Sequence, residues 1–469
     1  MYEDVIKRKN EIIQKAVGID YSKFEIEGIA FDYDRMMKEV SYSLDEIRKI
    51  QSETQVGNTP LVELKNLTKL VRKISKLGKG ARIFLKDESA NPSGSFKDRR
   101  ASVSIYHAKN HGYKGVIAAT SGNYGAAVAS QAAKYGLRAI IVQETFDSNH
   151  VGQPEILEKG RACEAYGAEV VQLTVGPELF YYTLKLLDET GYFDASLYTP
   201  FGIAGIETLG YEIATQVKSR YGRFPDAVLV THAGGGNVTG TARGLKKAGA
   251  KTKVIGSSVD LRGLHMASDH DFNRKSFTTG HTGFGIPFSA YPDRVDVPRN
   301  AARSLRYLDR YVLVTQGEVF FTTEALAQVE GMMRGPAGNT SLTAALSIAK
   351  EMDEDQIIVV QETEYTGAGK LPSAQLTFAK KMGVIVKNGN SIKEDVPGKV
   401  IAIPESIEQI GIIEYPLENL KKSYVKESIK AYGRSKFSDV EKKFMAEDTN
   451  SNSQEIDKML EEVLKDGKA

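Results

Sequence analysis

The fold class rests first on nine residues, Asn91-Pro92-Ser93-Gly94-Ser95-Phe96-Lys97-Asp98-Arg99. In this segment a tight turn precedes a helix whose first residues include Lys97. A lysine at a helix start can be partly desolvated, and it lies beside the positive end of the helix dipole. Both effects favour the neutral amine, which Schiff-base chemistry requires. Taken alone, the segment is also compatible with an ordinary capped helix that carries a solvated lysine.

Two later motifs each connect a buried-type strand to a helix. The first is Thr120-Ser121-Gly122-Asn123-Tyr124-Gly125, where backbone N–H groups form an anion site suited to a carboxylate. Within it, Asn123 could offer its amide to an aromatic oxyanion. The second is Thr231-His232-Ala233-Gly234-Gly235-Gly236-Asn237-Val238-Thr239-Gly240, whose three glycines let the backbone approach a phosphate at a helix N-terminus. It matches neither the P-loop nor the dinucleotide-binding fingerprint.

Short apolar runs alternate with helical stretches on both sides of these motifs. The runs that predict strands are 83–86, 116–119, 139–142, 170–173, 227–231, 253–257 and 357–361. Helices are predicted for 124–135 and 156–166. Repeated strand–helix alternation indicates an α/β fold with parallel sheets. Ligands of such sheets usually bind beyond the carboxyl ends of the strands, where the three motifs lie.

In this order, the three motifs resemble the fold-type II family of pyridoxal 5′-phosphate enzymes, which includes threonine synthase, threonine ammonia-lyase and the cysteine synthases. The segment 57–61 resembles the family's entry strand, and the resemblance covers residues 55–375. It implies two open parallel-sheet α/β domains with the cofactor in the cleft between them. We therefore expect a larger cofactor-binding domain over 55–98 and 200–403 and a smaller domain over 99–199.

The resemblance also assigns roles to residues of the motifs. Lys97 is expected to be the catalytic residue and to carry pyridoxal 5′-phosphate as a covalent aldimine. Asn123 is expected to contact the phenolic oxygen of the cofactor. The cofactor phosphate would be bound by Gly234, Gly235, Gly236 and Asn237. The α-carboxylate of the substrate would be received by Thr120, Ser121, Gly122 and Tyr124.

The pyridine nitrogen of the cofactor needs a partner after the last core strand. The segment Thr366-Gly367-Ala368-Gly369-Lys370 resembles a Thr-Gly-x-Gly motif of threonine synthase at that place. A hydroxyl at Thr366 would hydrogen-bond the nitrogen without forcing its protonation, which gives a milder electron sink than a carboxylate does. The nearby carboxylates of Glu362 and Glu364 are alternatives. His232 is either a buried, hydrogen-bonded histidine or an acid/base of the pocket.

Composition excludes several classes of protein. The 469 residues carry a formal net charge of +2, which gives no bulk attraction to nucleic acid. One cysteine excludes an intrachain disulfide and a multi-cysteine metal site, and we expect no metal. The N-terminus is charged from its start, and no stretch reaches the ~20 apolar residues that span a bilayer. A cytoplasmic protein is expected.

The two ends of the chain differ from the centre. Residues 1–54 are predicted to form a helical N-terminal extension, and residues 404–469 a charged helical C-terminal extension. The tail is interpreted either as a solvated appendage or as an arm that docks on another subunit. The glycine-rich loop 279–285 is a lid, a pocket wall or an ordinary surface loop.

At the level of the whole chain, the sequence resembles the β subunits of thiolases within this family. The resemblance implies an acyltransferase of ornithine degradation that cleaves 2-amino-4-oxopentanoate with coenzyme A as co-substrate, giving acetyl-CoA and alanine. It also implies a heteromer with a small α subunit, a homodimer of this chain, and no membrane partner. The alternatives are a threonine synthase-like or ammonia-lyase type of enzyme, and a scaffold without catalytic activity.

Four further residues have both a structural and a functional interpretation. Cys163 lies in a helix that precedes a strand, where a small buried side chain is expected rather than a nucleophile. Arg99 and Arg100 follow Lys97 on one helix and are either structural or anion-binding. Tyr124 either flanks the cofactor or packs at a helix start.

Overall fold

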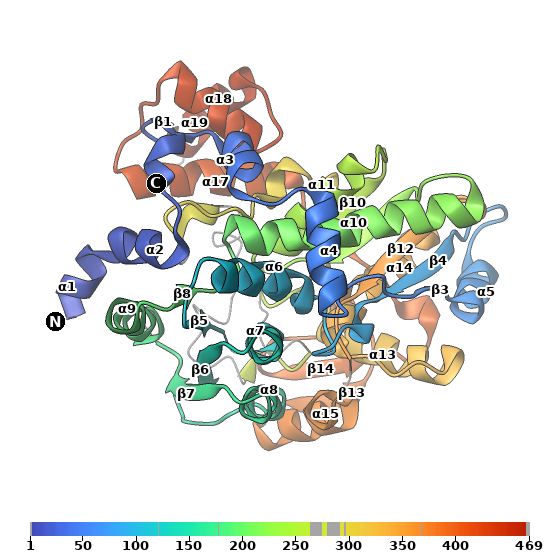
Figure 1. The fold of residues 1–469 in the computed structure, drawn as a ribbon. Helices are drawn as coiled ribbons and strands as arrows, with labels where there is room; N and C mark the ends of the chain where they lie inside the picture. Colours follow the sequence, from blue (N-terminus) through green and yellow to red (C-terminus); the bar gives the residue numbers. More distant parts are fainter. Residues whose placement is uncertain are drawn as a thin grey trace.

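A computed structural model describes residues 2–120, 122–176, 178–262, 274–278, 291–294, 297–365 and 367–465. These residues form two main sheets that are flanked by helices (Figure 1). The strands predicted from apolar runs are present, and the α/β class is confirmed.

The larger sheet has seven strands in the order β15-β11-β10-β9-β12-β4-β3. Their bounds are β3 Leu61–Glu63, β4 Arg82–Asp87, β9 Ala227–Thr231, β10 Lys253–Val259, β11 Arg310–Val314, β12 Ile357–Glu362 and β15 Ile413–Glu414. The inner strands are parallel, whereas β3 and β15 are antiparallel to their neighbours at the two edges. The carboxyl ends of the inner strands therefore meet at one edge of the sheet.

The smaller main sheet has four parallel strands in the order β7-β6-β5-β8. Their bounds are β5 Gly115–Ala119, β6 Arg138–Phe146, β7 Glu169–Thr174 and β8 Phe193–Asp194. All four lie inside the segment expected to form the smaller domain, although the domain limits themselves stay a prediction. Two further pairs are β1 Glu25–Glu27 with β2 Ala30–Phe31, and β13 Ile385–Asn388 with β14 Val400–Ile403.

Both faces of the larger sheet are buried at its centre, which is why the central strands β4, β9 and β12 are nearly continuous apolar runs. On β12, Ile357 and Val359 belong to the core on the side of α10, whereas Ile358 and Val360 belong to the core on the side of α13 and α14. The helices around the two sheets are α5 Lys65–Ile74, α6 Lys97–Asn110, α7 Asn123–Tyr135, α8 Pro154–Ala165, α9 Glu178–Thr190, α10 Pro200–Tyr221, α11 Gly236–Lys247, α13 Gln316–Glu330, α14 Pro336–Ala349, α15 Pro372–Lys381 and α16 Ser391–Glu394.

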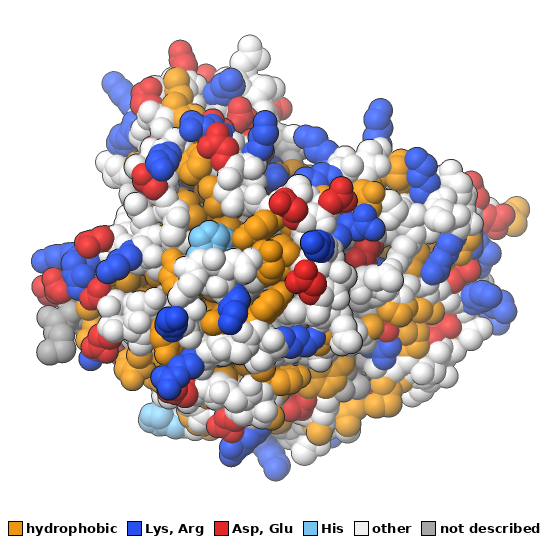
Figure 2. All heavy atoms as spheres, viewed as in Figure 1, with side chains coloured by type: hydrophobic (Ala, Val, Ile, Leu, Met, Phe, Trp, Pro, Cys, Tyr) orange, Lys and Arg blue, Asp and Glu red, His pale blue; other side chains and the backbone are white. Residues whose placement is uncertain are grey.

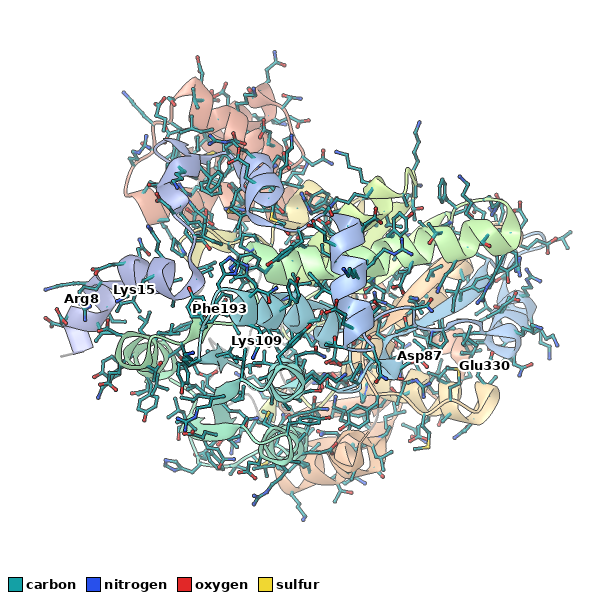
Figure 3. The ribbon with its side chains drawn as sticks, viewed as in Figure 1. Arg8, Lys15, Asp87, Lys109, Phe193 and Glu330 are labelled. Atoms are coloured by element: carbon teal, nitrogen blue, oxygen red, sulfur yellow. The ribbon has the colours of Figure 1, made fainter. Side chains whose placement is uncertain are left out.

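The N-terminal extension contains α1 Tyr2–Lys7, α2 Lys9–Val17, α3 Tyr33–Val40 and α4 Leu44–Glu53. It is not purely helical, because β1 and β2 form a small hairpin between α2 and α3. At its start, Arg8 donates to Asp188 of α9 over 2.7 Å, at the N-terminal edge of the molecule (Figure 3). At its end, Ser43 and Glu46 form a capping box that begins α4.

The C-terminal extension ends in α17 Leu417–Tyr432, α18 Asp439–Asp448 and α19 Ser453–Lys465, which gather beside β1 and α3 (Figure 1). Asp448 is buried and accepts from Arg303 and Arg306, each over 2.6 Å. Glu441 accepts from the backbone N–H of Ile29 over 3.0 Å. The interpretation of a simple solvated appendage is therefore wrong, because the tail packs against the N-terminal extension and the segment around Arg303. The extension also supplies edge strand β15.

Each helix in the described ranges is too short or too polar to span a bilayer. On the face shown in Figure 2, acidic and basic side chains are interspersed with apolar ones, without a broad patch of a single charge. That distribution agrees with the formal net charge of +2.

Candidate active site

A cavity of about 160 Å³ brings the three sequence motifs together. Its lining comes from the start of α6, the loop before α7, the start of α8, the loop before α11 and the segment after β12. The lining residues are Phe96, Lys97, Arg100, Thr120, Gly122, Asn123, Tyr124, Glu155, Leu197, Tyr198, Thr231, Ala233, Gly234, Gly235, Gly236, Asn237, Ala337, Thr363 and Glu364. The cavity thus lies at the carboxyl ends of the parallel strands, as expected for such sheets.

Lys97 is the first residue of α6 and lines the cavity. Burial lowers the pKa of its amine well below the ordinary value, and the nearby guanidinium of Arg100 adds to the effect. The turn before it is fixed because the Asp98 carboxylate accepts from the backbone N–H and the hydroxyl of Ser93, each over 2.7 Å. Within that turn Gly94 has φ +79°, and a Cβ there would lie 2.3 Å from the ring of Tyr365. The structure therefore presents an amine of lowered pKa on a rigid turn.

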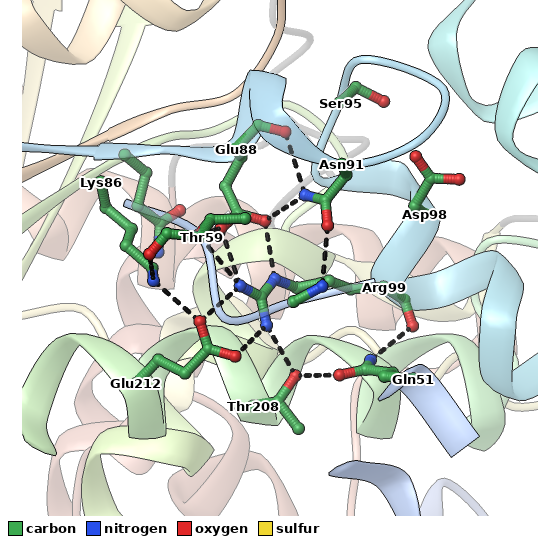
Figure 4. Close-up of polar contacts among 12 residues, drawn as sticks. Gln51, Thr59, Lys86, Glu88, Asn91, Ser95, Asp98, Arg99, Thr208 and Glu212 are labelled. Carbon is green, nitrogen blue, oxygen red and sulfur yellow. Dashed lines mark hydrogen bonds and ion pairs between the residues drawn. The ribbon is translucent and has the colours of Figure 1, made fainter. Parts of the chain in front are cut away.

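Arg99 faces away from the cavity and holds α6 in place. Its guanidinium is fully buried and pairs with Glu88 over 2.6 Å and with Glu212 over 2.8 Å (Figure 4). Lys86 donates to the same Glu212 carboxylate over 2.8 Å. From the N-terminal extension, Gln51 donates to the Arg99 backbone carbonyl over 3.1 Å. Of the two interpretations of Arg99, the structural one is therefore confirmed.

Arg100 instead lies at the glycine-rich loop. A Cβ on Gly236 would lie 2.0 Å from Arg100 Nη2, and a Cβ on Gly234 would lie 2.1 Å from the hydroxyl of Tyr198. Burial lowers the pKa of Arg100 to about 10, so the guanidinium stays charged at neutral pH. Its Nε and the Nδ2 of Asn237 are buried donors without an acceptor among the described residues. Helix α11 begins at Gly236 without a side-chain cap. This combination provides donors for an anion.

The side chain of Asn123 is held by two residues that follow β12, Glu364 and Lys370. Its Nδ2 donates to Glu364, and its Oδ1 accepts from Lys370 over 3.3 Å. Lys370 also forms an ion pair with Glu364 and lies 3.4 Å from the carboxylate of Glu155. Since an amide nitrogen carries two hydrogens, Asn123 keeps one donor for a ligand in the cavity.

The expected carboxylate-binding motif is only partly described. Thr120, Gly122 and Tyr124 line the cavity at the start of α7. Ser121, Thr366 and the loop 279–285 lie outside the described residues. The prediction that Thr366 contacts a pyridine nitrogen therefore stays a prediction.

Glu362 and His232 are buried and lie outside the lining of the cavity. Glu362 is fully buried away from the cavity lining, and its pKa is raised well above the ordinary value, first because of burial and then because of Glu364. His232 is buried between the hydroxyls of Tyr311 and Ser304, at 3.2 and 2.9 Å, and burial lowers its pKa to about 3. The structure therefore supports the interpretation of a neutral, hydrogen-bonded histidine outside the cavity.

Sequence reasoning did not identify several residues of the cavity wall. Glu155 lies in the first turn of α8, Tyr198 precedes α10, and Thr363 follows β12 directly. Lys370, on the short 3-10 helix Ala368–Lys370, does not line the cavity but contacts the lining residues Glu155 and Glu364. The contact of Lys370 with Glu155 joins segments far apart in the sequence, which no local pattern signals. Thr363 could have been predicted from the sequence, because it lies at the carboxyl end of a predicted core strand, where ligands of such sheets bind.

The chain matches the family model described as pyridoxal-phosphate dependent enzyme over residues 53–364. The chain belongs to this family, and its architecture is the fold-type II one. A crystal structure of the threonine deaminase from T.th., at 25% identity, covers 70% of this chain and 99% of that chain with a TM-score of 0.53.

Two curated relatives match almost the whole chain. Both are named 2-amino-4-ketopentanoate thiolase beta subunit. One, from an unknown prokaryotic organism, is 64% identical over 463 residues and covers 98% of each chain. The other, from Acetoanaerobium sticklandii, is 60% identical over 462 residues and also covers 98% of each chain.

The cavity fits pyridoxal phosphate on its own geometry. The amine of Lys97, whose pKa is lowered by burial, suits a carbonyl carbon, and the glycines beside Arg100 leave room that a Cβ would fill. The buried donors of Arg100 and Asn237 would gain an acceptor from the phosphate.

Proposed function

We propose that this chain is the β subunit of a 2-amino-4-ketopentanoate thiolase, an acyltransferase that depends on pyridoxal phosphate. The reaction is the thiolytic cleavage of 2-amino-4-oxopentanoate with coenzyme A to acetyl-CoA and alanine. One observation carries the proposal: the 64% and 60% identities extend over 98% of the chain. The family model covers residues 53–364, whereas the likeness to the two relatives also includes the N-terminal and C-terminal extensions.

The cysteine content supports a reaction that needs no acyl-enzyme on sulfur. The chain has one cysteine, Cys163, which is 1% exposed, and burial raises the pKa of its thiol to about 12. A thiol in that state is a poor nucleophile. The sulfur that receives the acetyl group is then supplied by coenzyme A, the proposed co-substrate.

Different residues of the cavity would bind different parts of the cofactor. Gly234, Gly235, Gly236 and Asn237 would hold the cofactor phosphate at the N-terminus of α11, with Arg100 beside it. Lys97 would hold the cofactor carbonyl carbon, and Asn123 would donate to the phenolic oxygen. When bound, pyridoxal phosphate supplies an electron sink that stabilises a carbanion on an amino acid.

The chain's own groups then orient the substrate and move its α-proton. The backbone at Thr120 and Gly122, next to the N-terminus of α7, suits the substrate α-carboxylate. The lowered pKa of the Lys97 amine favours its neutral form, which is the form that accepts a proton. Glu364 stays ionised: burial opposes this, but Lys370 and Lys159 hold its pKa below the ordinary value.

The name of the two relatives supports a partner, because a β subunit implies an α subunit. We include in the proposal a small α subunit, a homodimer of this chain, a cytoplasmic location and a place in ornithine degradation. The two expected domains, 55–98 with 200–403 and 99–199, would close around the substrate between the two sheets.

The test is an assay of the purified chain, with and without its candidate α subunit, loaded with pyridoxal phosphate. The substrates are 2-amino-4-oxopentanoate and coenzyme A, and the products are measured as acetyl-CoA and alanine. The proposal expects both products in equal amounts. Absence of acetyl-CoA together with release of ammonia from threonine or serine would contradict it and favour the ammonia-lyase alternative.

A further inference from the structure

Thiolysis requires two proton movements that the binding residues do not explain. The thiol of coenzyme A must lose its proton before sulfur attacks the C4 carbonyl, because the thiolate is the nucleophile. After the C3–C4 bond breaks, C3 must gain one proton to become the methyl group of alanine. The thiol proton and the proton gained at C3 balance each other, so one side chain can serve both steps.

Few described side chains in the cavity wall can accept and return a proton. Lys97 is assigned to the cofactor and the α-carbon, and Arg100 keeps its charge beside the glycines. Glu364 accepts hydrogen bonds from Asn123 and Lys370, and its pKa is lowered. These contacts hold Glu364 in the ionised state. Glu155 is the other carboxylate that lines the cavity.

Glu155 stands in a different environment from Glu364. It is 5% exposed, lies on the first turn of α8, and borders the cavity. Its carboxylate lies 3.4 Å from the amine of Lys370. Lys370 also forms an ion pair with Glu364, so its positive charge only partly neutralises the carboxylate of Glu155. A carboxylate that borders the cavity and is only partly compensated is suited to exchanging a proton with a bound substrate.

We propose that Glu155 is the general base that takes the proton of the coenzyme A thiol and then returns it to C3. This inference rests on the proposed function and names a catalytic residue for it. The carboxylate accepts the S–H proton. The electron pair left on sulfur forms the bond to C4, while the π electron pair of the C4 carbonyl moves to its oxygen. When the C=O bond re-forms, the C3–C4 bond breaks and leaves its pair on C3. Glu155 delivers the same proton to that pair, which restores the carboxylate.

The electrostatic surroundings agree with this role. Burial raises the pKa of Glu155, and the charge of Glu364 adds to the rise, while Lys370 and Lys159 lower it. The net direction is upward, toward the pKa that an acid/base needs near neutral pH. Lys370 would stabilise the carboxylate each time the proton leaves.

The test compares Glu155→Gln with Glu164→Gln, which makes the same change on an exposed residue of the same helix. Acetyl-CoA formation should fall about 10²- to 10⁴-fold in Glu155→Gln. Glu164→Gln should stay within about twofold of the parent. The pH profile of kcat/KM for coenzyme A should lose its acidic limb in Glu155→Gln. The visible absorbance of the bound cofactor should stay unchanged.

A second measurement separates a catalytic role from a structural one. Exchange of the substrate α-proton with D2O, measured without coenzyme A, needs Lys97 but not the proposed base. Glu155→Gln should retain this exchange. A short thiol with a pKa below the assay pH should recover more activity in Glu155→Gln than in the parent, because it arrives deprotonated.

Three outcomes would overturn the proposal. Thiolysis by Glu155→Gln at the parent rate shows that another group is the base. Loss of α-proton exchange together with thiolysis gives Glu155 a structural role in the whole site in place of the proposed role as the base. Absence of acetyl-CoA from the parent protein overturns the proposed function and this inference with it, whereas the first two outcomes leave the proposed function standing.

Discussion

Replacement of the buried Arg99 by Met should lower the free energy of unfolding more than the same replacement of an exposed arginine does. Arg99 and Glu88 both have fully buried side chains, paired over 2.6 Å. Without the guanidinium, Glu212 keeps Lys86 at 2.8 Å, but the donors left to Glu88 among the described residues are neutral, namely the hydroxyl of Thr59 and the amide of Asn91. Loss of one partner from a buried ion pair costs about 3–5 kcal/mol, because a buried charge is left uncompensated. We expect Arg99→Met to lower the free energy of unfolding by about that amount.

The assay is urea unfolding followed by circular dichroism, at one protein concentration and with saturating pyridoxal phosphate. Arg161→Met is the matched control, because Arg161 is 83% exposed and pairs with Glu164. That surface pair should contribute less than about 1 kcal/mol. Adding Glu88→Gln to Arg99→Met should recover part of the loss, since it removes the orphaned charge. A loss below about 1 kcal/mol in Arg99→Met, or an equal loss in Arg161→Met, would refute the reasoning.

Three further predictions follow from single contacts. Gly236→Ala should weaken pyridoxal phosphate binding at least about tenfold in an absorbance titration, because the new Cβ would lie 2.0 Å from Arg100 Nη2 and displace an anion-binding group; unchanged affinity would argue against this phosphate site. Cys163→Ala should retain acetyl-CoA formation, since the thiol is buried and protonated, and loss of turnover in a folded, cofactor-loaded variant would contradict that view. Burial alone would raise the pKa of Glu212, but Arg99 and Lys86 hold it well below its ordinary 4.5, so its stabilisation is present above that pH and is lost as the pH falls. Urea titrations at pH 6 and pH 4 measure the stability that is lost between these two pH values. This loss should be smaller in Glu212→Gln than in the parent protein, and an equal or larger loss in the variant would count against the ion pairs of Glu212.

The strands that the sequence predicted are those with continuous apolar runs. β4, β9 and β12 lie inside a sheet that is covered on both faces, so every residue of the run is apolar or tightly packed. The edge strands β3, β8 and β15 have two or three residues each, which is too short for any periodic signal. Their positions are fixed by pairing with distant strands.

The site could be predicted as far as its motifs are continuous in the sequence. Lys97, Asn123 and the glycines of the loop before α11 share one cavity. The choice between roles for Arg99 and Arg100 needed the structure, because neighbours on a helix differ by about 100° in direction. The contact of Lys370 with Glu155 and Glu364 also needed the structure, because it joins α8 to the segment after β12.

Reduction of the cofactor-loaded protein with borohydride, followed by peptide mapping, tests most directly whether Lys97 holds pyridoxal phosphate. The expected result is a single pyridoxyl adduct on Lys97, with loss of acetyl-CoA formation in proportion to its yield. An adduct on another lysine, such as Lys370 or Lys159, would contradict the assignment of the site. A protein whose bound cofactor gives no reducible adduct would contradict it as well.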